Sequence, residues 1–202
     1  MFVKICGITN LEDALISVES GADALGFVFA DSPRKIDPDN ARQIAASLKG
    51  RVNLVGVFSD MDINEVNEIS DLCMLDLLQF HGSEDSEYCN VFKRRVIKAI
   101  RFKDREDLNN IRSYDVEFIL VDSAASGMTC DWEKLREYGL HDKKLILAGG
   151  LNPGNVTTAI EQVMPFGVDS SSGVEAYIGK KDPAKVREFI KQAKTAVKEK
   201  RL

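Results

Sequence analysis

The chain has 202 residues, and 27 Lys and Arg against 32 Asp and Glu leave a formal charge of −5 at pH 7. This balance argues against a nucleic-acid or anionic-membrane partner held by bulk charge. Hydrophobic residues make up 44% and charged residues 29% of the chain, which excludes a disordered protein and predicts a real core. The length predicts one compact domain over residues 1–202, because α/β barrels of this size form single units.

The sequence contains neither a long apolar run nor the basic start and cleavage site of a signal peptide, so we expect a cytoplasmic protein without a membrane partner. Its four cysteines are far apart and form no C-x-x-C pair, which predicts free thiols and neither a metal site nor a disulfide framework. They are Cys6, Cys73, Cys89 and Cys130.

Short β-branched or aromatic runs recur along the whole chain, and each is typical of a buried strand. The predicted strands are residues 2–6, 24–29, 52–58, 76–80, 95–100, 116–121, 144–148 and 167–170. Segments with helical spacing lie between them, and most open on a capping residue. The predicted helix starts are Asn10, Asp37-Pro38, Asp62, Ser83, Asp104, Asp131, Asn152-Pro153 and Asp182-Pro183.

Eight strand-helix units in 202 residues predict a minimal (β/α)8 barrel. The rival is an open doubly wound sheet, which more often has five or six strands and a G-x-G-x-x-G loop after the first one. Here CGIT follows the first strand, which favours the barrel. In such a barrel, polar residues at the carboxyl ends of the strands are the candidates for chemistry.

The loops after the seventh and eighth predicted strands are rich in Gly and Ser. LAGGLNPGNV contains Gly149 and Gly150, and DSSSGVE carries Asp169 followed by Ser171, Ser172 and Gly173. Loops at these two places often hold phosphate, because Gly permits close backbone approach and exposed N–H groups face the anion. Either loop alone is equally consistent with a plain strand end, but the pair predicts a phosphorylated small molecule as ligand.

Cys6 ends the first predicted strand, and the strand period of two puts it on one face with Lys4, pointing into the barrel. A neighbouring ammonium lowers a thiol pKa toward neutrality, so we expect that Cys6 can act as a base. Asp122 follows the apolar run EFILV, where a raised pKa suits a general acid. The alternatives are an inert core thiol and a loop cap.

Two further strand-end side chains are candidates for binding. Arg34, in DSPRKI, can meet a carboxylate through its planar fork, or it can be an ordinary surface residue. His81, in QFHG, can titrate near neutral pH, or it can be a structural histidine.

These residues lie in motifs that resemble phosphoribosylanthranilate isomerase, a family of tryptophan biosynthesis, over nearly the full length. The motifs are KICGIT, GFVFADSPRKI, VGVF, QFHGSE, VD, DW, LAGGLNPGNV and DSSSGVE. The resemblance implies an Amadori rearrangement of an aminoaldose to a ketose, with Cys6 as the general base and Asp122 as the general acid. It also implies that Arg34 holds the anthranilate carboxylate, that Asp169 contacts the ribose, and that the two Gly-rich loops hold phosphate. Neither a metal nor another cofactor is implied.

One stretch departs from the family pattern. The family usually has a G-G-T-G-like segment after the acid, whereas this chain reads SAASGMTC at 123–130. Two other functions stay open at this point: a related barrel acting on another phosphosugar, such as an aminoaldose of histidine biosynthesis, and a degenerate barrel that only binds a phosphate ester. The sequence leaves a monomer and a homodimer equally open.

Overall fold

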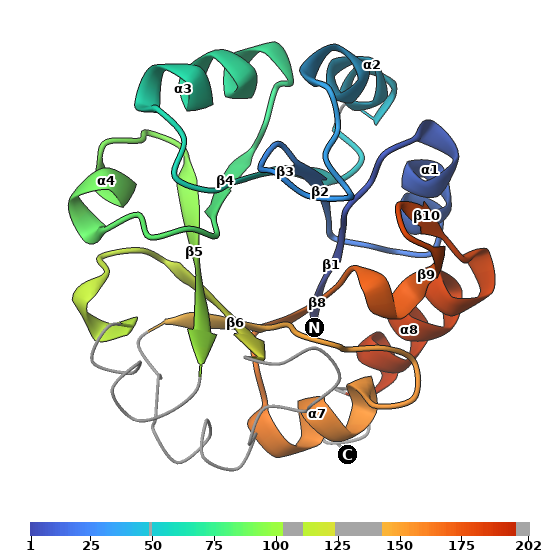
Figure 1. The fold of residues 1–202 in the computed structure, drawn as a ribbon. Coiled ribbons are helices and arrows are strands. Elements are labelled where there is room, and N and C mark those ends of the chain that lie inside the picture. The colour runs from blue at the N-terminus through green and yellow to red at the C-terminus, as the bar shows by residue number, and fades with distance from the viewer. Residues whose placement is uncertain (49, 103–110, 124–142, 197–202) are drawn as a thin grey trace.

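The computed structural model describes residues 1–48, 50–102, 111–123 and 143–196. Within these ranges, parallel strands close into one barrel in sequence order, and helices form a ring outside it (Figure 1). The barrel strands are β1 (Phe2–Cys6), β2 (Ala24–Val28), β3 (Asn53–Phe58), β4 (Leu77–Phe80), β5 (Arg95–Phe102), β6 (Phe118–Ser123), β7 (Lys144–Leu147) and β8 (Gly167–Ser170). The helices are α1 (Leu11–Glu19), α2 (Pro38–Leu48), α3 (Ile63–Leu72), α4 (Ser86–Asn90), α7 (Val156–Val163) and α8 (Pro183–Thr195).

The closed barrel confirms the predicted (β/α)8 fold and excludes the open doubly wound sheet. β8 pairs with β1 in parallel, with Lys4 opposite Asp169, so the sheet has no free edge. All of the predicted strands are present, with ends shifted by two residues or fewer. The carboxyl ends of the strands therefore lie at one end of the barrel.

The strand period of two divides the apolar side chains into two layers. Val3 and Ile5 of β1 pack outward into the core beneath the helices. Leu77 of β4 and Ile97 of β5 belong to a second cluster that fills the inside of the barrel. Because both faces of each strand are covered, the strands are continuous buried runs, as parallel sheets require.

Several predicted helix starts are confirmed in detail. The side chain of Asn10 accepts a hydrogen bond from Asp13 N at 2.9 Å and caps α1. Asp62 caps α3, and Asp182 precedes Pro183 and accepts from two backbone N–H groups of α8. Asp37 accepts from the N–H groups of residues 39 and 40 at the start of α2.

Two predicted helix starts are wrong. Ser83 is not a cap, because Asp85 accepts from Tyr88 N at 2.7 Å and starts α4. The Asn152-Pro153 pair forms a turn in which Asn152 Oδ1 accepts from Gly154 N at 2.8 Å, so α7 starts later, at Val156. The predicted starts at Asp104 and Asp131 lie outside the described residues. Residues 124–130 of the divergent loop lie outside them as well.

A small excursion after β8 contributes to the site. The 3-10 helix η1 (Ser172–Val174) leads into β9 (Glu175–Tyr177), which pairs antiparallel with β10 (Lys180–Lys181). This hairpin lies beside α1 and α8 (Figure 1). Among the described helices, none combines the length and apolar character needed to cross a membrane.

Candidate active site

An ion pair lies inside the barrel beneath Cys6. Lys4 Nζ donates to Asp169 Oδ1 at 3.0 Å; Lys4 is fully buried and Asp169 is 7% exposed. Burial opposes the charged form of Lys4, but Asp169 and Cys6 outweigh it and raise the Lys4 pKa above its ordinary value. The inward placement of Lys4 and Cys6 that the strand period predicts is therefore confirmed.

The predicted lowering of the Cys6 pKa is wrong for the free protein. Burial raises the pKa of the Cys6 thiol, and the opposing effect of Lys4 is smaller than this desolvation. Asp169 adds to the rise, because its negative charge disfavours a second one nearby. The strand pattern identifies the neighbouring cation but contains no information about solvent exclusion.

Gly26 of β2 makes this arrangement possible. A Cβ atom at Gly26 would lie 2.7 Å from Cys6 Sγ and 3.2 Å from Lys4 Nζ. A larger residue would displace both groups, so the thiol and the ammonium occupy space that only glycine leaves.

Gln79 of β4, His81 directly after β4 and Asp122 of β6 form a row. His81 Nε2 lies 3.5 Å from Asp122 Oδ2, and Gln79 Nε2 lies 3.5 Å from His81 Nδ1. In the neutral tautomer whose Nδ1 accepts from the Gln79 amide, Nε2 carries the proton that faces Asp122. Asp122 keeps 27% of its side chain exposed, so the apolar run before it does not bury the carboxylate.

Gln79 itself belongs to the barrel interior. It is 1% exposed, and its Oε1 is buried without a hydrogen-bond partner among the described residues. Gln79 is not among the site residues that the sequence predicts. The signal was available, because the period of two from Leu77 points Gln79 inward and His81 after it.

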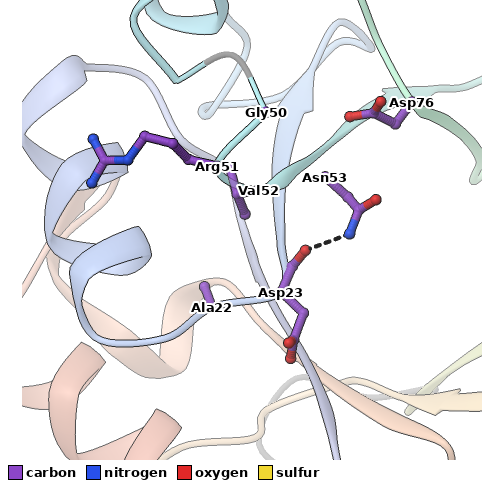
Figure 2. Close-up of a pocket in the computed structure, with 7 residues that line it drawn as sticks. All are labelled: Ala22, Asp23, Gly50, Arg51, Val52, Asn53 and Asp76. Carbon is purple, nitrogen blue, oxygen red and sulfur yellow. Dashed lines mark hydrogen bonds between the residues drawn. The ribbon is translucent and has the colours of Figure 1, made fainter.

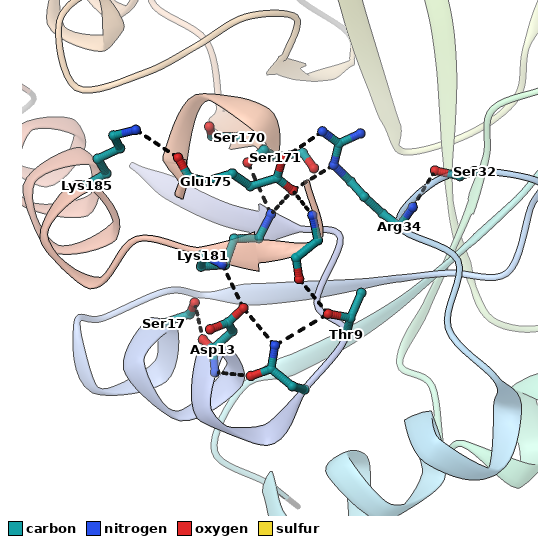
Figure 3. Close-up of polar contacts among 12 residues, drawn as sticks. Thr9, Asp13, Ser17, Ser32, Arg34, Ser170, Ser171, Glu175, Lys181 and Lys185 are labelled. Atoms are coloured by element: carbon teal, nitrogen blue, oxygen red, sulfur yellow. Dashed lines mark hydrogen bonds and ion pairs between the residues drawn. The ribbon is translucent and has the colours of Figure 1, made fainter. Parts of the chain in front are cut away.

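Arg34 does not face solvent as a free cation. Its Nε and Nη2 donate to the two carboxylate oxygens of Glu175 at 2.7 and 2.8 Å, and Lys181 Nζ lies 3.2 Å from Glu175 Oε1 (Figure 3). Glu175 and Lys181 were missed as site residues, although Glu175 is the last letter of the DSSSGVE motif. The hydrogen bond to Glu175 raises the Arg34 pKa further.

The loops after β7 and β8 lie against each other. Gly149 and Gly150 have φ of 84° and 69°, and Ser170 Oγ donates to Leu151 O at 2.7 Å. A Cβ at Gly173 would lie 1.9 Å from Leu151 O, so only glycine permits this approach. The structure thus brings the two Gly-rich loops into contact.

Two cavities occupy opposite ends of the barrel. One of about 400 Å³ lies at the carboxyl ends of β4 and β5, and His81 and Arg101 are among its lining residues. Another of about 390 Å³ lies at the amino ends of the strands and is lined by Asp23, Arg51 and Asp76 (Figure 2). The described residues contain no group of three or more His, Cys, Asp and Glu that would hold a metal ion. The first cavity adjoins the residues described above, and the second does not.

These features define the class of protein: a (β/α)8 barrel whose titratable side chains and Gly-rich loops gather at the carboxyl ends of the strands. A model of the N-(5'phosphoribosyl)anthranilate (PRA) isomerase family matches residues 3–192. An N-(5'-phosphoribosyl)anthranilate isomerase of Geotalea uraniireducens is 50% identical over 202 residues, which cover 95% of this chain and 98% of that protein. The chain therefore belongs to the N-(5'-phosphoribosyl)anthranilate isomerase family and is an isomerase of tryptophan biosynthesis.

Solved structures agree with this assignment. The phosphoribosyl anthranilate isomerase of Thermotoga maritima superposes with a TM-score of 0.91 at 45% identity, covering 96% of this chain and 99% of that one. Another structure, of phosphoribosyl anthranilate isomerase with reduced 1-(o-carboxyphenylamino)-1-deoxyribulose 5-phosphate, has a TM-score of 0.90 at the same identity and coverage. A further structure concerns monomers generated from the dimeric Thermotoga protein.

Proposed function

We propose that the chain converts N-(5-phosphoribosyl)anthranilate to 1-(2-carboxyphenylamino)-1-deoxyribulose 5-phosphate by an Amadori rearrangement. The observation that carries this proposal is the solved family member that binds the reduced form of that product, at 45% identity to this chain. Cys6 and Asp122 end parallel strands of the same barrel, so their side chains serve one site from two sides.

The first step is ring opening, for which we assign Asp122 as the general acid. Its carboxyl proton goes to the furanose ring oxygen, the bond between this oxygen and carbon 1 breaks, and a Schiff base forms. His81 Nε2 lies 3.5 Å from Oδ2, which leaves Oδ1 to carry the transferred proton.

The second step is proton removal, for which we assign Cys6. The thiolate takes the proton from carbon 2, and the electron pair forms an enolamine, which then gains a proton at carbon 1 and loses one from its hydroxyl to give the ketone. Burial raises the Cys6 pKa, and the buried ammonium of Lys4 is the neighbour that opposes this rise and favours the thiolate. No electrons enter or leave, so the reaction is an isomerisation.

The remaining site residues hold the two anionic ends and the sugar. In this proposal the guanidinium of Arg34 binds the anthranilate carboxylate, and Asp169 contacts the ribose hydroxyls. The phosphate lies on backbone N–H groups of two loops, for which glycine and serine leave room. These loop residues are Gly149, Gly150, Ser171, Ser172 and Gly173.

The test is the decay of substrate fluorescence on adding the purified chain, with Cys6→Ala and Asp122→Asn beside the wild type. Each variant should lose about 10²- to 10⁴-fold in kcat, as removal of a proton-transfer group does. Matched controls are Cys89→Ala, a buried thiol on α4, and Asp115→Asn, an exposed carboxylate before β6. Wild-type turnover that survives either active-site change would overturn the role assigned to that residue.

A further inference from the structure

Three charged side chains meet behind the loops of the site, and they come from segments far apart in the chain. Glu175 is 7% exposed and contacts both Arg34 and Lys181, which itself is 1% exposed (Figure 3). Burial alone would raise the Glu175 pKa, but Arg34 and Lys181 outweigh it and hold this pKa below its ordinary value. Glu175 is therefore a carboxylate placed between two cations.

The contact with Glu175 determines which edge of the Arg34 guanidinium remains available. Nε and Nη2 donate to Glu175 Oε1 and Oε2 in a bidentate pair. Nη1 makes no hydrogen bond with the residues that the structure describes, so one of its protons and the second proton of Nη2 form the open edge. That edge is the one that can meet a second carboxylate in the planar geometry that guanidinium favours.

The contact with Lys181 extends toward the proposed phosphate loop. Lys181 Nζ donates to Ser171 O at 3.1 Å as well as facing Glu175 Oε1. Lys181 is opposite Glu175 in the β9–β10 pairing, and its backbone N donates to Asp13 Oδ2 at 2.8 Å. The cation is thus held from α1 on one side and supports the carbonyl of Ser171 on the other.

Arg34 and Ser171 both pack against Gly7, which directly follows Cys6. A Cβ at Gly7 would lie 2.7 Å from Arg34 Cδ and 2.9 Å from Ser171 Oγ, and Gly7 has a φ of +73°. Arg34 and the start of the loop after β8 therefore pack on the same glycine, which leaves little freedom for either to move alone.

We propose that Glu175 is a positioning residue that joins the two anion-binding ends of the substrate site. Its carboxylate aims the open edge of Arg34 at the substrate carboxylate and, through Lys181, holds the Ser171 carbonyl so that the loop at 171–173 receives phosphate. This inference rests on the proposed function for the identity of the two anions. It assigns Glu175 no proton transfer.

The direction in which Glu175→Gln changes the affinity for anions distinguishes a positioning role from simple charge balance. Glu175 is an anion next to two sites that bind anions, so its charge alone repels both ends of the substrate. If it served only as a counter-charge, Glu175→Gln would tighten anion binding. If it positions Arg34 and Ser171, the same change weakens anion binding at both ends.

The experiment measures dissociation constants for anthranilate and for inorganic phosphate separately, by calorimetry at fixed pH and ionic strength. Glu175→Gln should weaken both by about tenfold or more, as loss of hydrogen bonds to charged groups does. Glu175→Asp keeps the charge and shortens the side chain, so it should weaken both without removing the ion pair. It also keeps the test decisive where Glu175→Gln fails to fold.

Glu12→Gln is the matched control, because Glu12 is an exposed carboxylate that pairs with Lys180 of the same hairpin and touches neither Arg34 nor Lys181. It should leave both constants unchanged. Tighter or unchanged binding in the Glu175 variants overturns the inference, as does weakening of anthranilate alone. The inference is also overturned if the wild type binds neither anthranilate nor inorganic phosphate. Turnover of the complete substrate is measured in parallel, so the reaction can fail while the positioning role stands.

Discussion

Lys4 and Asp169 form an ion pair in the middle of the barrel, and they are paired across the seam where β8 meets β1. At this seam the inward-facing side chains are charged, whereas the inward-facing side chains of the neighbouring strands are apolar. It also sets the electrostatic surroundings of Cys6, because Lys4 favours the thiolate and Asp169 disfavours it.

Removing one partner of this pair should destabilise the fold. Lys4→Met leaves Asp169 buried and unpaired, so we expect a loss of about 3–5 kcal/mol in the free energy of unfolding. Urea unfolding followed by circular dichroism measures it. The double variant Lys4→Met, Asp169→Leu removes both charges and should recover most of the loss; a double variant as unstable as the single one would contradict this account.

The thiol of Cys6 should titrate above its ordinary value in the free protein. Burial raises the Cys6 pKa more than Lys4 lowers it, so thiolate absorbance in the ultraviolet, taken as the difference from Cys6→Ala, should grow only above the pH at which free thiols ionise. Lys4→Met removes the opposing cation and should move the transition to still higher pH. A transition near neutral pH in the wild type would show that Lys4 outweighs desolvation.

We expect His81 to support Asp122 as the general acid and not to donate the proton itself. His81→Ala removes the imidazole whose Nε2 lies 3.5 Å from Asp122 Oδ2, and the loss of this polar contact should lower kcat by about 10- to 100-fold. His81→Gln can keep a donor there and should retain more activity. Thermal unfolding of both variants provides the check, since an equal loss of kcat accompanied by unfolding would indicate a structural histidine.

Two glycines with nearly the same φ provide a matched test of the phosphate loop. Gly150 has φ +69° and Gly50 has φ +75°, and both would leave an added Cβ free of contacts within 4 Å. Alanine at either position should cost about 1–2 kcal/mol of stability, because L residues are strained there. Only Gly150→Ala should raise KM; an equal rise in Gly50→Ala would mean that the effect is general destabilisation.

Much of this architecture follows from local patterns. The period of two in FVKIC directs Lys4 and Cys6 inward, and alternating strand and helix signals define the barrel even though individual ends differ by a residue or two. The predicted start of α4 is wrong because Ser83 and Asp85 are both good capping residues. In the structure Asp85 caps the helix, while Ser83 N donates to Asp60 Oδ1 at 2.7 Å, a contact that the local pattern does not contain.

The sequence by itself determined the order of the strands, the inward faces, the Gly-rich loops and the motifs of the family, because each depends on residues close together in the chain. Only the tertiary structure decided that Glu175 occupies one edge of Arg34, 141 positions away, and that His81 faces Asp122. It also decided the direction of the Cys6 pKa. These outcomes depend on distance and on exclusion of water, which strands distant in sequence create only when the barrel closes.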